Sequence, residues 1–331
     1  MKFERKPAKK SATQAEVKPR TNHANKMHPD NPFAKGYPMA QLVAVKPELA
    51  QFLLTTARGE QSISFADPAA VKCLNQALLA WQYGLNAWDI PDGFLCPAVP
   101  GRLDYILHLK DLLLDSNGGK LPKKKNLQWL DIGCGANLIY PLLAVKAVGG
   151  QVIAAELDPQ ALGHAQQLMI NHQLQSRIEL RQQGQSTAIF HGIIQPRDVI
   201  DITLCNPPFH QSAAEAAAGS QRKRQNLGLA PDAALLNFAG RDHELWCEGG
   251  ELAFLTQMAR ESIDFANQVF WFSSLVAKVA HVEPLCRELR QLGAQSVRVI
   301  EMGQGQKLSR LIAWSFLAEP QRQLWRQHRW L

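Results

Sequence analysis

From Leu127 onwards, short apolar segments alternate with helix-like segments, and this alternation restricts the possible folds more than any other feature of the sequence. It is typical of a parallel sheet covered by helices on both faces. We therefore expect an α/β protein with a doubly wound, seven-stranded sheet, mostly parallel, that ends in an antiparallel hairpin around Gly303-Gln304-Gly305. Eight segments have a strand-like pattern, one more than a seven-stranded sheet contains: 127–131, 152–157, 178–181, 201–205, 251–256, 269–276, 296–301 and 311–317. Helices are expected between them, including 232–246 and 261–268.

The residues before this pattern have a helical character. Apolar residues recur at helical spacing over 39–57 and 67–83, and Asp67-Pro68 has the residue types of an N-cap and a first helical position. A loop with three prolines follows, and Arg102 stands directly after it, at the start of a helix expected over 103–114. We expect a basic tail that is disordered in isolation (1–36), followed by a helical extension (37–125). An α/β domain (126–318) and a basic, aromatic C-terminal segment (319–331) complete the chain.

Positive charge is concentrated in the tail. The net charge is +7, and residues 1–36 carry nine basic and three acidic side chains, so nearly the whole excess lies there. Such a segment suits a phosphate backbone, although a solubilising tail without a partner has the same composition. An Ala-, Gly- and Ser-rich loop near 211–229 adds a second basic run, either an RNA contact or a solvated loop. The candidate RNA-binding residues are Lys6, Lys9, Lys10, Arg20, Arg222, Lys223 and Arg224.

Composition excludes several classes of protein. No run of eighteen apolar residues is present, and the basic N-terminus lacks an apolar signal segment, so we expect a cytoplasmic protein with no membrane partner. The six cysteines are scattered without C-x-x-C spacing, which favours reduced core thiols over disulfides or a metal site. We expect a monomer. The C-terminal tryptophans, Trp325 and Trp330, either stack on bases or, as we favour, dock a helix on the core.

The strand at 201–205 runs directly into Asn206-Pro207-Pro208-Phe209. Two prolines remove two N–H donors and fix φ, so the chain leaves the sheet along one stiff path. Asn206 and the Pro207 carbonyl then offer two acceptors beside the ring of Phe209, a set that suits a planar group bearing an NH₂. By itself the dipeptide also fits a strand-ending turn with a core phenylalanine.

Two further features fall on the same edge, because ligands of open α/β sheets sit beyond the carboxyl ends of the strands. Gly133-Cys134-Gly135 permits close backbone approach, and Glu156 stands where an acid accepts ribose hydroxyls. Leu138 replaces the third glycine of a dinucleotide fingerprint, and Asp131 suits an ammonium better than a phosphate. We therefore expect S-adenosylmethionine as the cofactor.

These motifs resemble those of class I, Rossmann-like methyltransferases, and the Asn-Pro-Pro-Phe version resembles that of enzymes that methylate a planar amino nitrogen. The stretches around Arg102 (Leu95-Cys-Pro-Ala-Val-Pro-Gly-Arg102) and Gly133 (Asp131-Ile-Gly-Cys-Gly-Ala-Asn-Leu-Ile) are similar to a narrower family. It contains bacterial 23S rRNA adenine-N6 methyltransferases and a eukaryotic U6 small nuclear RNA methyltransferase, and the resemblance covers about 28–317. It implies one adenine of 23S rRNA, free or in a large-subunit precursor particle, as substrate, and Arg102 as a ligand of the cofactor carboxylate.

The expected site follows from these motifs. A flipped adenine would be held by the catalytic residues Asn206, Pro207, Pro208 and Phe209. The cofactor would be held by Arg102, Asp131, Gly133, Gly135, Glu156 and Asn206. Guanine-N2 and a protein glutamine amide remain alternative acceptors, because each presents a planar NH₂. A non-catalytic rRNA-binding assembly factor is the alternative from another class.

Overall fold

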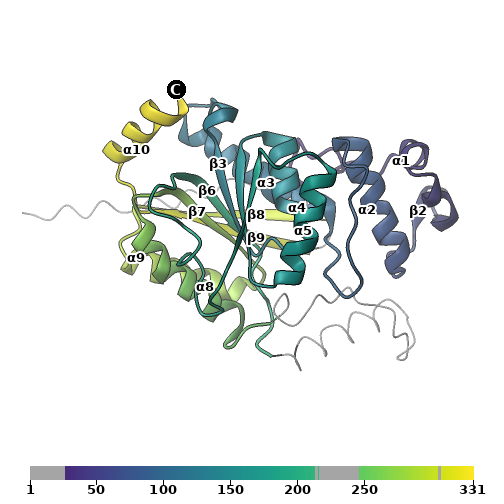
Figure 1. The fold of residues 1–331 in the computed structure, drawn as a ribbon. Coiled ribbons are helices and arrows are strands. Elements are labelled where there is room, and N and C mark those ends of the chain that lie inside the picture. Colours follow the sequence, from purple (N-terminus) through teal and green to yellow (C-terminus); the bar gives the residue numbers. More distant parts are fainter. Residues whose placement is uncertain (1–26, 213–214, 216–245, 305–306) are drawn as a thin grey trace, which may run out of the picture.

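The structure is a computed structural model that describes residues 27–212, 215, 246–304 and 307–331. Its centre is a seven-stranded sheet in the order β5-β4-β3-β6-β7-β9-β8 (Figure 1). The strands are β3 (Gln128–Ile132), β4 (Gln151–Glu156), β5 (Ile178–Gln182), β6 (Ile200–Cys205), β7 (Val269–Val276), β8 (Ser296–Gln304) and β9 (Lys307–Ser315). The first five run parallel, and β9 is antiparallel to both of its neighbours. The predicted doubly wound sheet with an antiparallel C-terminal hairpin is confirmed.

Both faces of the sheet are buried, as the continuous apolar strands predict. Successive residues of β3 enter different cores: Trp129 packs on one face and Leu130 on the other. The Trp129 face is covered by α3 (Val99–Ser116), α4 (Ile139–Leu143) and α5 (Pro159–Asn171), and the Leu130 face by α8 (Gly250–Glu261) and α9 (Val282–Gln291) (Figure 1). Alternation at period 2 therefore places every second side chain of a strand in each core.

One predicted strand is wrong. The segment 251–256 forms the first half of α8, and the fifth strand of the sheet is β7. Glu251, Leu255, Met258 and Ala259 are the buried residues after Gly250, a spacing that places them on one helical face. A short apolar run fits a strand or a buried helix equally well, and only its packing decides. The helix expected over 261–268 is the end of α8 followed by the short η4 (Ser262–Phe265), and the one expected over 232–246 lies outside the described residues except Trp246.

The N-terminal extension is partly helical. The helix α2 (Pro68–Tyr83) begins as predicted, with the Asp67 side chain accepting a hydrogen bond from the Ala69 N–H at 2.9 Å. The segment 39–57, expected as one helix, is instead α1 (Met39–Val45), η1 (Pro47–Phe52) and a strand β1 (Leu53–Thr55) that pairs with β2 (Gln61–Ile63). The helix expected over 103–114 is α3, which begins at Val99 and therefore carries Arg102 in its first turn. The extension and the sheet share one hydrophobic core.

The C-terminal segment is docked on the sheet. It consists of α10 (Glu319–Trp325) and η6 (Arg326–Trp330), and the indole N–H groups of Trp325 and Trp330 both donate to Asp201 Oδ1, at 2.8 and 2.7 Å. Arg329 Nη2 donates to Asp201 Oδ2 at 3.2 Å. Because Trp330 is buried, its ring is not available for stacking on a base. Within the described ranges, no helix has the length and apolar character needed to cross a bilayer.

Candidate active site

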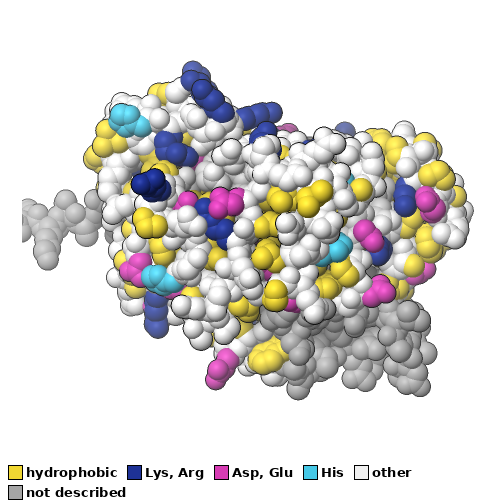
Figure 2. Space-filling model, viewed as in Figure 1, with side chains coloured by type: hydrophobic (Ala, Val, Ile, Leu, Met, Phe, Trp, Pro, Cys, Tyr) yellow, Lys and Arg dark blue, Asp and Glu magenta, His cyan; other side chains and the backbone are white. Residues whose placement is uncertain are grey.

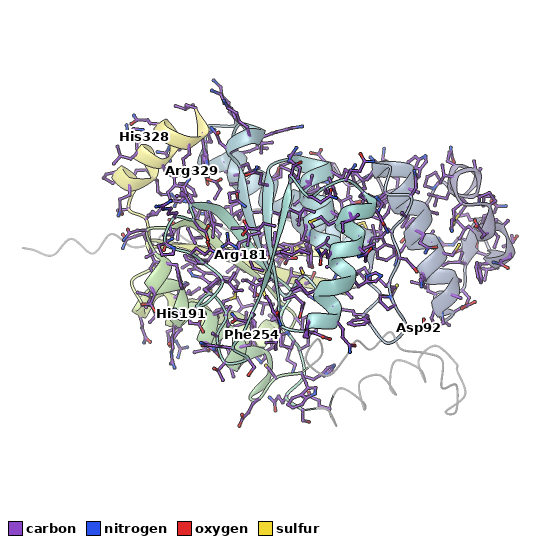
Figure 3. The ribbon with its side chains drawn as sticks, viewed as in Figure 1. Asp92, Arg181, His191, Phe254, His328 and Arg329 are labelled. Carbon is purple, nitrogen blue, oxygen red and sulfur yellow. The ribbon has the colours of Figure 1, made fainter. Side chains whose placement is uncertain are left out.

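The predicted site residues follow the ends of three neighbouring strands. Because β4, β3 and β6 are adjacent and parallel, their carboxyl ends meet at one edge of the sheet, and a cavity of about 800 Å³ opens there. Phe254 of α8 lies on its wall (Figure 3). Six of the predicted residues line this cavity: Arg102, Gly133, Gly135, Glu156, Asn206 and Pro208. Tertiary packing therefore gathers most of the candidates in one place.

The glycine turn after β3 is held against β4. Gly133 and Gly135 have φ values of 76° and 63°, a region that other residues seldom enter. The N–H groups of Gly133 and Cys134 both donate to the Ala155 carbonyl, at 3.0 and 2.9 Å. A side chain added at Gly133 would meet no atom within 4 Å, so backbone conformation, and not space, requires glycine there. The turn exposes its backbone to the cavity.

Asp131 lies at the end of β3 with no exposed surface. Neither of its carboxylate oxygens has a hydrogen-bond partner in the described part of the chain. Burial raises the pKa of Asp131 well above its usual value, the nearby charge of Glu156 raises it further, and Arg102 opposes both. A buried carboxylate without donors is costly, so this position is complementary to a bound cation.

Glu156, at the end of β4, is also buried, but both of its carboxylate oxygens accept hydrogen bonds. Its Oε2 accepts the Gly135 N–H at 2.8 Å, and its Oε1 accepts the N–H groups of Leu157 and Asp158 at 2.7 and 3.0 Å. A carboxylate has about four lone-pair positions, so about one remains for a ligand, on the Oε2 side. Glu156 thus fixes the glycine turn and can still accept one hydroxyl.

Arg102 reaches the cavity from α3 and contacts two other elements. Its Nη1 donates to the side-chain oxygen of Asn206 at 3.1 Å and to the Tyr140 hydroxyl at 2.9 Å. Its guanidinium carbon lies 5.5 Å from the centroid of the Tyr140 ring. Burial raises the pKa of Tyr140 to about 12, so the hydroxyl stays protonated at neutral pH. The guanidinium therefore lies between the helix that starts after the glycine turn and the end of β6.

The four residues after β6, Asn206 to Phe209, differ in whether they line the cavity. Asn206 and Pro208 line the cavity, whereas Pro207 is buried. Phe209 is half-buried and is not among the lining residues, so its ring does not form the wall in this conformation. His210 pairs through its backbone with Trp246, which brings the segment before α8 beside this turn. Of the predicted catalytic side chains, Asn206 is the polar one that faces the cavity.

The loop after β5 also lines the cavity, and the sequence analysis did not predict this. The N–H groups of Ile189 and Phe190 donate to Glu261 Oε2 at 2.9 and 2.8 Å, and the Gln183 side chain donates to the His191 carbonyl at 3.0 Å. The lining residues of this loop are Gln183, Gln185, Ser186, Thr187, Ala188 and Ile189. Its position directly after a predicted strand was the available signal, since residues that follow parallel strands lie at this edge.

Two more lining residues, Tyr140 and Trp246, were also missed, although Tyr140 lies in the stretch after Asp131 that carries the family resemblance. The indole N–H of Trp246 is buried and finds no hydrogen-bond partner among the described residues. All predicted RNA contacts, from Lys6 to Arg20 and from Arg222 to Arg224, lie outside the described residues. The described part of the chain holds no group of three or more histidine, cysteine or acidic side chains arranged for a metal ion.

One basic run does lie within the described residues. Lys120, Lys123, Lys124 and Lys125 are exposed and precede β3, so they lie at the amino ends of the strands, opposite the cavity. Figure 2 shows lysine and arginine side chains gathered near the C-terminal helix, away from the edge where Figure 3 places Phe254. These lysines are therefore separate from the walls of the cavity.

The sheet, with its glycine turn and its cavity at the carboxyl edge, defines a methyltransferase of the doubly wound type, and comparison with known proteins agrees. A family model described as RNA methyltransferase matches residues 21–318. The chain therefore belongs to this family of RNA methyltransferases.

Individual bacterial proteins are similar to this chain over most of its length. The chain is 54% identical over 297 residues to ribosomal RNA large subunit methyltransferase F of Escherichia coli (strain SMS-3-5 / SECEC). The aligned region covers 89% of this chain and 95% of the relative. The protein of the same name from Shigella boydii matches with the same identity and coverage.

Solved structures of a human relative match over a similar length. The METTL16 catalytic domain in complex with MAT2A 3′UTR hairpin 6 superposes with a TM-score of 0.73 at 30% identity, covering 89% of this chain and 99% of that one. The N-terminal domain of human METTL16 in complex with SAH superposes with a TM-score of 0.71 at 28% identity, covering 88% and 99%.

Proposed function

We propose that this protein methylates the exocyclic N6 of a single adenine in 23S rRNA, with S-adenosylmethionine as the methyl donor. The observation that carries the proposal is that Asn206 lines the same cavity as the glycine turn, at the carboxyl edge of the sheet. Membership of the RNA methyltransferase family supports the reaction, and the names of the bacterial relatives support large-subunit rRNA as the substrate.

The cavity residues fit the cofactor. Arg102 lines the cavity and would bind the cofactor carboxylate. Asp131 lies behind the lining, next to Ile132, and its buried carboxylate, which has no hydrogen-bond partner among the described residues, would attract the ammonium of the methionine moiety. Glu156 keeps about one acceptor position for a ribose hydroxyl, and the Gly133–Gly135 turn permits close approach of the backbone. When bound, the cofactor supplies an electrophilic methyl group on a sulfonium. The relative crystallised with SAH supports this assignment.

The part of the site that would hold the base offers two oxygen atoms as hydrogen-bond acceptors. Asn206 Oδ1 and the Pro207 carbonyl accept the two hydrogens of the adenine amine, which directs the nitrogen lone pair out of the plane of the base. Pro207 and Pro208 hold these acceptors on a stiff backbone, so little ordering is left for the moment of reaction. Stacking on Phe209 would require that ring to turn towards the cavity when the base enters. No separate base is assigned, because the amine loses its proton readily once it is alkylated.

RNA must be held outside this cavity as well. We propose that the basic tail (1–36), with Lys6, Lys9, Lys10 and Arg20, and the basic run Arg222, Lys223 and Arg224 contact phosphates, while 37–125 and 126–318 form the catalytic body with 319–331 docked on it. METTL16, a relative crystallised with an RNA hairpin, supports an RNA acceptor over a protein side chain. We expect the enzyme to act as a cytoplasmic monomer.

The proposal is tested on the RNA of a strain that lacks the gene. Mass spectrometry of its 23S rRNA is expected to show the loss of one N6-methyladenosine, restored by the wild-type gene and not by the Asn206→Ala variant. Loss of an N2-methylguanosine would assign the guanine alternative, and an unchanged methylation pattern would refute the enzyme assignment. Titration of the purified protein with S-adenosylmethionine separates a methyltransferase from an rRNA-binding assembly factor, which would give no binding heat.

A further inference from the structure

The side-chain oxygen of Asn206 already has a partner in the structure. Arg102 Nη1 donates to it at 3.1 Å, although the two residues lie 104 positions apart in the chain. The second hydrogen of Nη1 goes to the Tyr140 hydroxyl at 2.9 Å, so both hydrogens of this nitrogen have acceptors. The contact of the guanidinium with the Tyr140 ring further limits its movement. These contacts direct Nη1 of Arg102 towards Asn206, whereas Nε and Nη2 form no hydrogen bond with another described residue.

We propose that Arg102 is a positioning residue for Asn206 and couples the cofactor to the acceptor base. Its Nη1 fixes the amide with the oxygen towards the cavity, and its other edge, Nε and Nη2, binds the cofactor carboxylate. This inference rests on the proposed function and adds to it a link between the two ligands.

The chemistry of the amide explains why orientation matters. The two ends of an asparagine amide have nearly the same shape, but one accepts and the other donates. A flipped amide would direct its NH₂ towards the guanidinium and towards the substrate amine, donor against donor in both cases. The oxygen has two lone pairs, so it accepts from Arg102 and from the substrate at the same time. Because a charged donor forms a stronger hydrogen bond than a neutral one, Arg102 selects the productive orientation.

A shared guanidinium has a consequence for the order of binding. A carboxylate pairs with arginine through two parallel hydrogen bonds and restricts the side chain. Cofactor binding therefore reduces the freedom of Arg102 and, through Nη1, that of Asn206. The acceptor base then binds to an amide that is already ordered, so the two ligands bind with positive coupling, equal in both directions.

The test uses Arg102→Lys, Asn206→Ala and the double variant in the full chain, with Arg287→Lys on the exposed side of α9 as the matched control. A lysine keeps the charge but loses the planar fork. At saturating cofactor, Arg102→Lys is expected to lower the single-turnover rate about ten- to hundredfold. In the Asn206→Ala background the same change is expected to cost less than about threefold, because its target is gone.

A second readout does not depend on turnover. S-adenosylhomocysteine is expected to tighten the binding of a 23S rRNA fragment to the wild-type protein several-fold, and to do so less in Arg102→Lys and in Tyr140→Phe, which removes the hydroxyl that orients Nη1. Rate effects that multiply in the double variant, or equal tightening in all variants, would overturn the positioning role. Absence of methyl transfer by the wild-type protein to any 23S rRNA would instead refute the proposed function, and the binding measurement would still test the coupling.

Discussion

Asp131→Asn is expected to stabilise the ligand-free protein and to weaken cofactor binding at the same time. Asp131 is completely buried, and both of its oxygens lack hydrogen-bond partners among the described residues. Asparagine has nearly the same volume and no charge. The amide is also without partners, but an unpaired buried charge costs more than an unpaired neutral group, so at a pH where Asp131 is ionised the change should raise the unfolding free energy by about 1–3 kcal/mol.

The cofactor should respond in the opposite sense. A hydrogen bond between a carboxylate and an ammonium contributes about 1.5–3 kcal/mol, so its loss raises the dissociation constant roughly 10- to 150-fold. Calorimetry with S-adenosylmethionine measures this change, and urea unfolding monitored by circular dichroism measures the change in stability. The two effects therefore have opposite signs, as in the trade-off between stability and function at strained sites.

The pH dependence follows from the direction of the pKa shift. Burial, and then the charge of Glu156, raise the pKa of Asp131 in the folded ligand-free protein. The folded state therefore holds this proton more tightly than the unfolded state. Its contribution to stability is present below the unfolded pKa of about 3.9 and is lost as the pH rises through the folded pKa. The cofactor ammonium favours the ionised form, so we expect proton release on binding, which calorimetry in two buffers of different ionisation enthalpy detects.

Glu156→Gln is the matched control for this prediction. The carboxylate of Glu156 accepts three backbone N–H groups, so an amide NH₂ there faces a donor and should lower the urea midpoint. A lower urea midpoint for Asp131→Asn, or a wild-type affinity for the cofactor, would refute the reasoning.

Three further outcomes are expected. Asn206→Ala should lower the single-turnover rate of methyl transfer by on the order of 10²-fold, as the loss of a preorganised polar contact does; a rate within threefold of wild type would contradict it. Asp201→Ala should cost about 3–5 kcal/mol of unfolding free energy, because it removes the carboxylate that pairs with Arg329 and accepts two indole N–H groups; the cost should shrink in a chain that ends at Ala318, and an undiminished cost there would argue against this anchor. Deletion of 1–26 should weaken binding of a 23S rRNA fragment and flatten its dependence on salt, since fewer phosphate contacts release fewer counterions; an unchanged slope of log K against log salt would assign the tail to solubility alone.

Much of the architecture follows from local chemistry that the sequence displays. The segment 201–205 is short, largely apolar and followed by Asn206-Pro207-Pro208, so it predicts a strand buried on both faces, and the structure has β6 there. Asp67-Pro68 predicts the start of α2, because a carboxylate cap and a proline each satisfy a requirement of the first turn. Gly133, Glu156 and Asn206 lie at the carboxyl ends of the first, second and fourth predicted strands, so their presence at one edge follows from the geometry of parallel sheets.

Other features could not be decided locally. Residues 251–256 have an apolar content that suits a strand, and they form a helix because Leu255, Met258 and Ala259 pack together against the Leu130 face of the sheet. The segment 39–57 includes β1 because β2 offers it hydrogen-bonding partners. In both cases the pattern allows two structures, and contacts with distant residues select one.

The sequence by itself determined that this chain forms a doubly wound sheet and that an asparagine, a glycine turn and buried acids lie at one edge of it. Only the tertiary structure decided that Arg102 donates to Asn206 and Tyr140 and that Asp201 anchors the C-terminal helix. It also decided that, among the described residues, Asp131 has no hydrogen-bond donor whereas Glu156 has three. The physical reason is the distance along the chain between the residues that interact. Backbone conformation and periodicity depend on neighbouring residues, whereas the partner of a buried polar group depends on which distant segments pack against it.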